Sequence, residues 1–138
     1  MIFFTDENIS KNAAYMLGYV EPRHQVRSHL DYFKGGTPDT SWLRDVASWN
    51  EDETIVVVCG DSRILKNKVE RQVLKECELM FVLLAPGWLH LKWPVYAWKI
   101  VKAWPDIVKN VEQARYPMVF EVMSGTLSVY PRGRVSKL

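Results

Sequence analysis

Two hydrophobic patterns alternate along the chain, one typical of β-strands and the other of α-helices. Apolar, β-prone runs cover residues 2–5, 54–59 and 79–85, and residues 25–33 form a weaker candidate strand. The run at 54–59 is continuous and β-branched, which is typical of a strand buried on both faces of a parallel sheet. These runs predict a mostly parallel central sheet.

Segments with the apolar spacing of amphipathic helices separate the strand-like runs. They cover residues 9–20, 37–49, 67–78 and 94–114. Thr37 is predicted as the N-cap of the second helix, with Pro38 at its first position. Pro105 is expected to break or kink the last helix. The alternation predicts a three-layer α/β domain with helices on both faces and right-handed crossovers.

The C-terminal region predicts a hairpin followed by a tail. Val119–Met123 and Thr126–Tyr130 resemble two strands around a turn at residues 124–125. Residues 131–138 contain basic residues and no acid, and we expect them to be loose. A chain of 138 residues fits one domain, so we expect a single domain at 1–130 and a basic tail at 131–138.

Composition narrows the class of protein. The chain is 48% hydrophobic and 25% charged, values typical of globular proteins, and its net charge of +2 favours no particular partner. Cys59 and Cys77 lie in apolar-periodic segments and are interpreted as reduced core residues, which favours a cytoplasmic protein. The sequence predicts no signal peptide, and its longest apolar run, 79–85, is too short for a membrane span.

Three aspartates are predicted to meet at one edge of the sheet. Asp6 and Asp61 follow the runs at 2–5 and 54–59, and Asp39 opens the helix after the weak second strand. Ligands of open α/β sheets bind beyond the carboxyl ends of the strands. Converging carboxylates either raise a pKa or bind a hard cation such as Mg²⁺ or Mn²⁺, which can activate water for phosphodiester hydrolysis.

Each of these acids also has a structural interpretation. Asp6 is suited to capping a helix, Asp39 to stabilising a helix dipole, and Asp61 to a turn after Gly60. Asn8 is either an oxygen ligand or the N-cap of the first helix. Like-charge repulsion among the acids predicts that Asp61→Asn raises the melting temperature without metal.

Basic and aromatic residues suggest contacts with a nucleic acid. Ser62, Arg63 and Lys66 follow Asp61 and are candidate phosphate contacts, although this stretch also fits a solvated helix face. Further along, tryptophans and lysines interleave, a pattern that either stacks bases or combines core tryptophans with peripheral lysines. They are Trp88, Trp93, Trp98, Trp104, Lys92, Lys99 and Lys102.

The motifs around the acids resemble those of PIN-like domains. The stretches Thr5-Asp6-Glu7-Asn8, Thr37-Pro38-Asp39 and Val58-Cys59-Gly60-Asp61-Ser62-Arg63 are similar to the compact branch related to VapC-type toxins, over residues 1 to about 88. The resemblance implies a three-layer PIN-like fold and a Mg²⁺- or Mn²⁺-dependent endoribonuclease whose metal-binding and catalytic acids match Asp6, Asp39 and Asp61. It also implies RNA as substrate, a cognate antitoxin protein and a possible homodimer.

The chain departs from that pattern at one position. Family members often have a further acid shortly after the last one, where this chain has Ser62-Arg63 and no acid before Glu70. This favours either a single tightly held ion or a weak second ion completed by a substrate phosphate, with Asp31 and Asp45 as possible fourth contributors. The alternative function is a catalytically silent PIN-like module that binds RNA or a protein partner.

Overall fold

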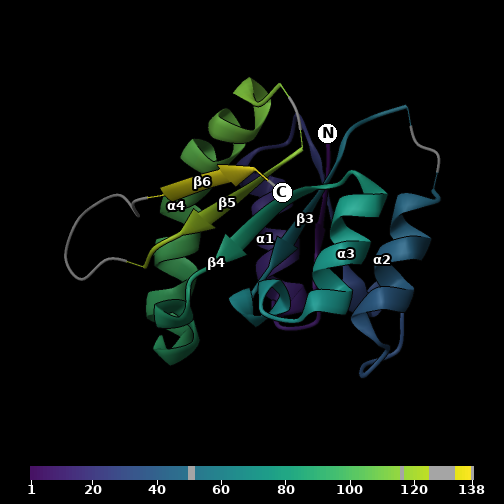
Figure 1. Ribbon diagram of the computed structural model, residues 1–138. Coiled ribbons are helices and arrows are strands. Elements are labelled where there is room, and N and C mark those ends of the chain that lie inside the picture. Colours follow the sequence, from purple (N-terminus) through teal and green to yellow (C-terminus); the bar gives the residue numbers. More distant parts are fainter. Residues whose placement is uncertain (50–51, 116, 125–132, 138) are drawn as a thin grey trace.

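Parallel strands form the centre of the computed structural model, which describes residues 1–49, 52–115, 117–124 and 133–137 (Figure 1). Within these residues the sheet has the order β2-β1-β3-β4-β5-β6, and β6 alone is antiparallel. Its strands are β1 (Ile2–Thr5), β2 (Gln25–Ser28), β3 (Ile55–Cys59), β4 (Met80–Leu84), β5 (Met118–Val122) and β6 (Gly133–Lys137). The predicted mostly parallel α/β sheet is confirmed.

The helices follow the strands in the predicted order. They are α1 (Lys11–Val20), α2 (Asp39–Ala47), α3 (Lys68–Cys77) and α4 (Trp93–Gln113), with short 3₁₀ turns η1 (His29–Asp31), η2 (Ser62–Leu65) and η3 (Pro86–His90). N-cap side chains determine where two of the helices begin. Ser10 Oγ accepts from the Ala13 N–H at the start of α1, and Asn67 Oδ1 accepts from two N–H groups of α3.

Side chains of the strands alternate between two buried layers, as the pleat requires. Phe3, Val56 and Val82 pack with α1 and α4, whereas Phe4 and Phe81 pack on the other face with α2 and α3. Figure 1 shows the two pairs of helices on opposite sides of the sheet. The three-layer prediction is therefore confirmed.

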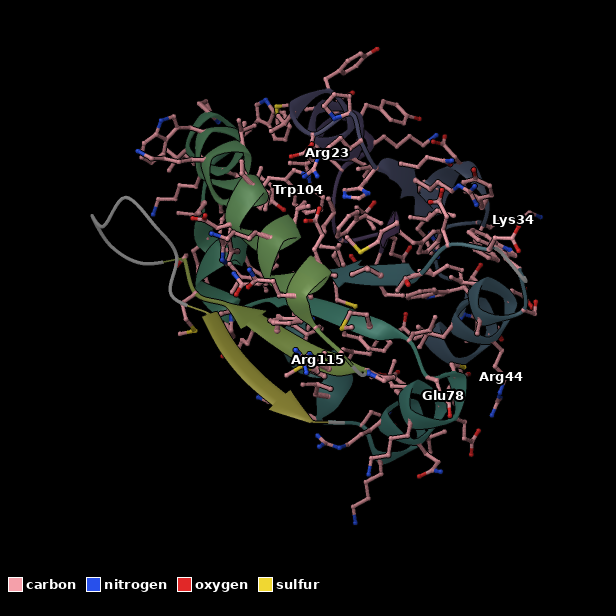
Figure 2. All side chains as sticks on the ribbon, turned by 90° about the horizontal axis from the view of Figure 1, so that it is seen from above. Arg23, Lys34, Arg44, Glu78, Trp104 and Arg115 are labelled. Atoms are coloured by element: carbon pink, nitrogen blue, oxygen red, sulfur yellow. The ribbon has the colours of Figure 1, made fainter. Side chains whose placement is uncertain are left out.

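The connection through α4 corrects the prediction that all crossovers are right-handed. The steps β3 to β4 and β4 to β5 run in the same direction across the sheet, but α3 and α4 cover opposite faces. These two crossovers therefore have opposite hands. On this face Trp104 of α4 is buried, and its ring lies 4.8 Å from that of Phe3. Figure 2 shows Trp104 among the packed side chains beside α4, with Arg44 and Glu78 at the periphery.

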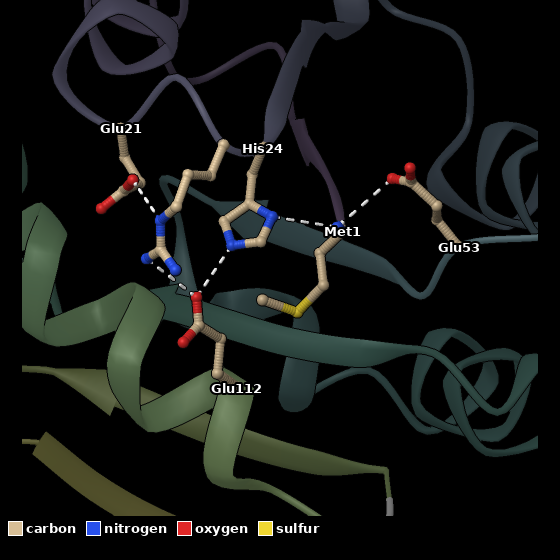
Figure 3. Close-up of polar contacts among 6 residues, drawn as sticks. Met1, Glu21, His24, Glu53 and Glu112 are labelled. Carbon is tan, nitrogen blue, oxygen red and sulfur yellow. Dashed lines mark hydrogen bonds and ion pairs between the residues drawn. The ribbon is translucent and has the colours of Figure 1, made fainter.

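Polar contacts hold the C-terminal half of α4 beside the start of β1 (Figure 3). The Met1 nitrogen lies 3.0 Å from His24 Nδ1 and 3.2 Å from Glu53 Oε2. Glu112 of α4 accepts from Arg23 at 3.1 Å and lies 2.8 Å from His24 Nε2. These contacts lie at the amino edge of the sheet, so they anchor α4 without occupying the opposite edge.

Several local predictions are wrong. Pro105 does not break α4, which continues through the proline as one helix with Trp104 and Ile107 on either side of it buried in the core. Val69 does not share the buried face of α3 formed by Val73 and Leu74 and is 66% exposed. The second strand, expected over residues 25–33, ends at Ser28, and η1 begins at His29.

The predicted tail contributes a strand. β5 does pair in an antiparallel hairpin-like arrangement, but its partner is β6 at Gly133–Lys137, and the expected strand Thr126–Tyr130 lies outside the described residues. An edge strand is held by backbone hydrogen bonds and needs little apolar sequence, so a hydrophobic pattern does not reveal it. None of the helices in the described ranges has the length and apolar character of a bilayer span.

Candidate active site

A cavity of about 310 Å³ opens at the carboxyl edge of the sheet. It is lined by Asp6, Asn8, Asp39, Asp61, Arg63, Ile64, Asn67 and Glu70. The topological rule therefore places the three predicted aspartates correctly, and the structure adds a fourth acid. This surface is called the acid cavity below.

Asp6 is the most buried acid of the cavity. It follows β1, and its N–H donates to Val58 O at 2.9 Å, which extends the pairing with β3. Its carboxylate accepts from the N–H of Gly60 at 3.0 Å, from the N–H of Asn8 at 3.2 Å and from Asn8 Nδ2 at 3.3 Å. Burial raises its pKa to about 6, although these hydrogen bonds act to lower it.

Asn8 is a partner of Asp6 rather than a helix cap. The N-cap of α1 is Ser10, two residues further on. The bonds from Asn8 to both carboxylate oxygens fix the rotamer of Asp6 at the cavity floor. Asn8 therefore orients the acid, and its exposed side chain also lines the cavity.

Asp39 is the first residue of α2 and is oriented by the indole of Trp42. Trp42 Nε1 donates to Asp39 Oδ1 at 2.8 Å, one helical turn away, while the Trp42 ring is buried beneath α2. The predicted N-cap is wrong: Pro38 occupies that position, and Thr37 Oγ1 instead donates to Lys34 O at 2.6 Å. Asp39 thus begins α2 with its carboxylate held by Trp42, and it lines the acid cavity.

Glu7 fixes the loop that leads into α2. It does not line the acid cavity, and its Oε2 accepts from the Gly36 N–H at 2.9 Å. Gly36 has a φ of 82°, a left-handed conformation that favours glycine. Glu7 and Gly36 thereby couple the end of β1 to the start of α2, which carries Asp39.

Asp61 is held by its neighbour Arg63. Its carboxylate accepts from the backbone N–H of Arg63 at 2.9 Å and from Arg63 Nε at 2.7 Å, so it caps η2. The Arg63 guanidinium holds the pKa of Asp61 below its usual value. The turn interpretation of Asp61 and its place in the cavity are therefore both correct.

Glu70 is the site residue that sequence reasoning missed. It lies in the first turn of α3, where Asn67 Oδ1 accepts from its N–H at 3.2 Å. Burial, followed by the negative charges of Asp39 and Asp61, raises the pKa of Glu70. The sequence could have indicated Glu70, because α3 also begins at the carboxyl edge of the sheet. An acid in the first turn of α3 therefore lies near that edge, as Asp39 does in the first turn of α2.

The other candidate residues lie away from the cavity floor. Asp31 bonds to Tyr15 at 2.6 Å and pairs with Lys11 at 3.0 Å, and Asp45 is exposed on α2. Lys66 is exposed and does not line the cavity, although its charge helps to lower the pKa of Asp61. The side chain of Ser62 lies outside the described part of the structure.

The chemistry of the acid cavity fits a hard divalent cation. Carboxylate oxygens are the donors that Mg²⁺ and Mn²⁺ prefer, and the raised pKa values of Asp6 and Glu70 mark a site where negative charge is costly without a counterion. In the residues described, however, no three side chains of His, Cys, Asp or Glu are grouped closely enough to hold one ion. The donor set is thus appropriate, but its members are spread around the cavity.

A contrasting pair of variants tests this electrostatic description. Asp61→Asn breaks the ion pair with Arg63, so its melting temperature in EDTA should be slightly lower than that of the wild type. The expected loss in the free energy of unfolding is no more than about 1 kcal/mol. Glu70→Gln removes a charge that Asp39 and Asp61 oppose, so its melting temperature should rise. This replaces the expectation that Asp61→Asn is stabilising. A rise for Asp61→Asn measured by calorimetry at pH 8 would show that repulsion outweighs the Arg63 pair.

Comparison with known proteins identifies the family. Residues 1–86 match the model of the PIN like domain, which covers more than half of the chain. The chain therefore belongs to the PIN-like domain family, a nuclease-type superfamily, and its α/β sheet is consistent with that fold. Neither the comparison with curated proteins nor that with solved structures found a significant match.

Proposed function

We propose that this PIN-like domain is a Mg²⁺- or Mn²⁺-dependent endoribonuclease that hydrolyses RNA phosphodiester bonds. The observation that carries the proposal is the acid cavity. Asp6, Asp39, Asp61 and Glu70 all line it at the carboxyl edge of the sheet, and two of them have raised pKa values. Membership of the PIN-like family supports the same class of reaction.

The residues of the acid cavity have distinct proposed roles. Asp6, Asp39, Asp61 and Glu70 would hold the cation, which when bound supplies activated water and charge neutralisation. Asn8 and the Gly60 N–H orient Asp6, and Trp42 orients Asp39. Arg63 lies at the cavity and is largely exposed, so its guanidinium can turn from Asp61 to a substrate phosphate.

The biological setting is proposed from the sequence resemblance. The motifs around the acids resemble those of VapC-type toxins, so we propose that the chain is the toxin of a toxin–antitoxin module. In this proposal a cognate antitoxin protein covers the acid cavity, and two copies of the chain form a homodimer. The protein acts on cytoplasmic RNA.

A catalytically silent module that binds RNA or a protein partner is the second candidate. One observation favours it: Arg63 neutralises Asp61 within the cavity, where a cation would otherwise be needed. In this case the acid cavity would bind no metal, and the exposed lysines of α3 would carry electrostatic binding.

Cleavage of a mixed RNA pool distinguishes the two candidates. The purified protein should cut RNA with Mn²⁺ or Mg²⁺ and not with EDTA. Asp39→Asn should reduce the rate at least a hundredfold, since it removes one of the proposed cation-holding carboxylates. Asp45→Asn is the matched control, because Asp45 is exposed on the same helix and does not line the cavity.

The two variants give each outcome a meaning. Equal loss for Asp39→Asn and Asp45→Asn would indicate damage to α2 rather than to a reaction site. If none of the proteins cuts RNA, a thermal shift with Mn²⁺ decides between the candidates. A shift in the wild type that Asp39→Asn abolishes indicates a selective enzyme, and no shift in either protein indicates the silent module.

A further inference from the structure

A second cavity, of about 260 Å³, lies beside the acid cavity and is mostly apolar. Its lining includes Asn8 and Gly60 on one side and Trp88, Leu91, Trp93 and Tyr96 on the other. We call it the aromatic cavity. From its position and walls we propose that it binds one unpaired nucleobase of the RNA strand whose phosphate lies at the acid cavity. This inference rests on the proposed function.

The two cavities share a wall. Asn8 lines both of them, and its side chain donates to Asp6 on the acid side. Gly60 lines the aromatic cavity and precedes Asp61 in the chain, while its N–H donates to Asp6. A ligand that fills both cavities must present a flat apolar ring next to an anionic group that can approach a cation. A nucleotide has these two parts.

The walls of the aromatic cavity are suited to a planar ring. The rings of Trp93 and Tyr96 are nearly parallel, at 18° with centroids 6.3 Å apart, and Trp88 meets Tyr96 edge-on at 5.6 Å. Trp88 is fixed, because its Nε1 donates to Val122 O at 2.9 Å. Trp93 is 48% exposed, so one part of its surface is free to stack on a base.

Polar groups at the walls can read the edge of a base. Burial raises the pKa of Tyr96 to about 12, so its hydroxyl is protonated at neutral pH and can donate a hydrogen bond. No hydrogen bond between residues in the described ranges occupies that hydroxyl. Asn8 adds an amide at the boundary with the acid cavity.

The charge on α4 fits an RNA strand. Lys92 is exposed just before the helix, and Lys102 Nζ lies 5.0 Å from the ring of the exposed Trp98. Lys92 directly precedes Trp93 of the aromatic cavity and Lys102 lies further along α4, and both positive charges attract a phosphate backbone. The base must be unpaired, because a base within a duplex is stacked and cannot enter a side pocket.

The tryptophans form a buried pair and an exposed pair. Trp88 and Trp104 are buried, as the core interpretation predicts, whereas Trp93 and Trp98 are exposed. Of the exposed pair, Trp93 lines the aromatic cavity and Trp98 does not. This difference provides a matched pair of variants on one helix.

Binding measured in EDTA tests the proposal without any cleavage. The probes are a fluorescein-labelled single-stranded RNA decamer and a ten-unit abasic phosphodiester chain of equal charge. Trp93→Ala should weaken binding of the RNA decamer roughly five- to a hundredfold, which corresponds to the loss of one stacked base. It should leave binding of the abasic chain unchanged within twofold. Trp98→Ala should change neither by more than twofold.

Each other result overturns the proposal. If Trp93→Ala weakens binding of the two probes equally, the cavity contacts the phosphate backbone or the general surface of the ligand and not a base. Equal effects of Trp93→Ala and Trp98→Ala would indicate non-specific stacking on α4. If Trp93→Ala binds RNA as the wild type does and has the same melting temperature, the cavity does not bind a base. It would then be a site for the side chain of a partner protein.

The binding test and the cleavage test can fail separately. Base-dependent binding that Trp93→Ala weakens, together with no cleavage in any metal, supports the aromatic cavity and rejects the nuclease. Metal-dependent cleavage that Trp93→Ala leaves at the wild-type rate and affinity supports the nuclease and rejects the aromatic cavity.

Discussion

Asp6→Asn is expected to stabilise the metal-free protein at pH 8 by up to about 3 kcal/mol. Asp6 is 6% exposed, and burial raises the pKa of its carboxyl from 3.8 to about 6. A shift of that size corresponds to roughly 3 kcal/mol between the two protonation states. Asparagine has nearly the same shape and does not ionise, so the variant escapes the cost of a buried charge.

The raised pKa of Asp6 also determines how the stabilisation by Asp6→Asn depends on pH. Below about pH 3 Asp6 is protonated in both the folded and the unfolded chain, so its ionisation costs no stability. As the pH rises from about 4 to about 6 the unfolded chain ionises while the folded chain keeps its proton, so stability is lost across this window and the full cost remains above it. The advantage of Asp6→Asn should therefore be largest at pH 8 and absent near pH 3, in urea titrations with EDTA.

Asp31→Asn is the control of opposite sign. The pKa of Asp31 is lowered by Tyr15 and Lys11, so this variant should gain nothing at pH 8. A loss of stability for Asp6→Asn at pH 8 would show that the hydrogen bonds from Gly60 and Asn8 outweigh burial. With Mn²⁺ added, the wild type should gain stability through binding, and Asp6→Asn should gain less.

Gly60→Ala is expected to reduce stability by about 2 kcal/mol and to reduce RNA cleavage as well. A Cβ at Gly60 would lie 3.0 Å from Asn8 Cβ, 3.0 Å from Ile9 Cγ1 and 3.1 Å from the Asn8 backbone carbon. Neither neighbour is the end of a flexible side chain, because Ile9 is buried and Asn8 is held by Asp6. The added methyl group must therefore displace the turn that orients Asp6.

Gly18→Ala provides the matched control. Gly18 lies in α1, and its added Cβ would find only Val26 Cβ at 3.9 Å, an ordinary contact. Alanine favours the helix by roughly 0.5–1 kcal/mol, so this variant should be more stable and fully active. Differential scanning calorimetry and the RNA cleavage assay measure both effects. A neutral Gly60→Ala would show that the Asn8 turn can move without loss.

The sequence predicts that Asp6, Asp39 and Asp61 lie at one edge of the sheet because sheet topology constrains their positions strongly. The apolar strands β1 and β3 end at Asp6 and Asp61, and parallel strands bring their carboxyl ends to one edge. Glu70 is not predicted at this edge, because the segment of α3 is interpreted from its charge and its apolar face. The position where α3 begins is not considered. The hydrogen bond from Trp42 to Asp39 depends on side-chain rotamers and has no sequence pattern of its own.

Other features could not be predicted because they depend on tertiary packing. Periodicity identifies the apolar stripe of α4 but does not say which face of the sheet it covers. Burial of Trp104 against Phe3 decides that question. Likewise, β6 is held through backbone pairing with β5, which a pattern of apolar side chains does not record.

The match to the PIN-like family ends at residue 86, and α4 begins at Trp93 on the face of α1. The acids of the site therefore come from the part of the chain inside the family match, whereas Trp88, Trp93 and Tyr96 come from the part after it. The opposite hand of the α4 crossover is what brings this second part beside Asn8 instead of beside α3. Under the proposed function, the acids of the reaction lie within the matched segment, whereas the aromatic wall of the base site comes from the segment after it. The aromatic wall can therefore be altered without changing any of the acids.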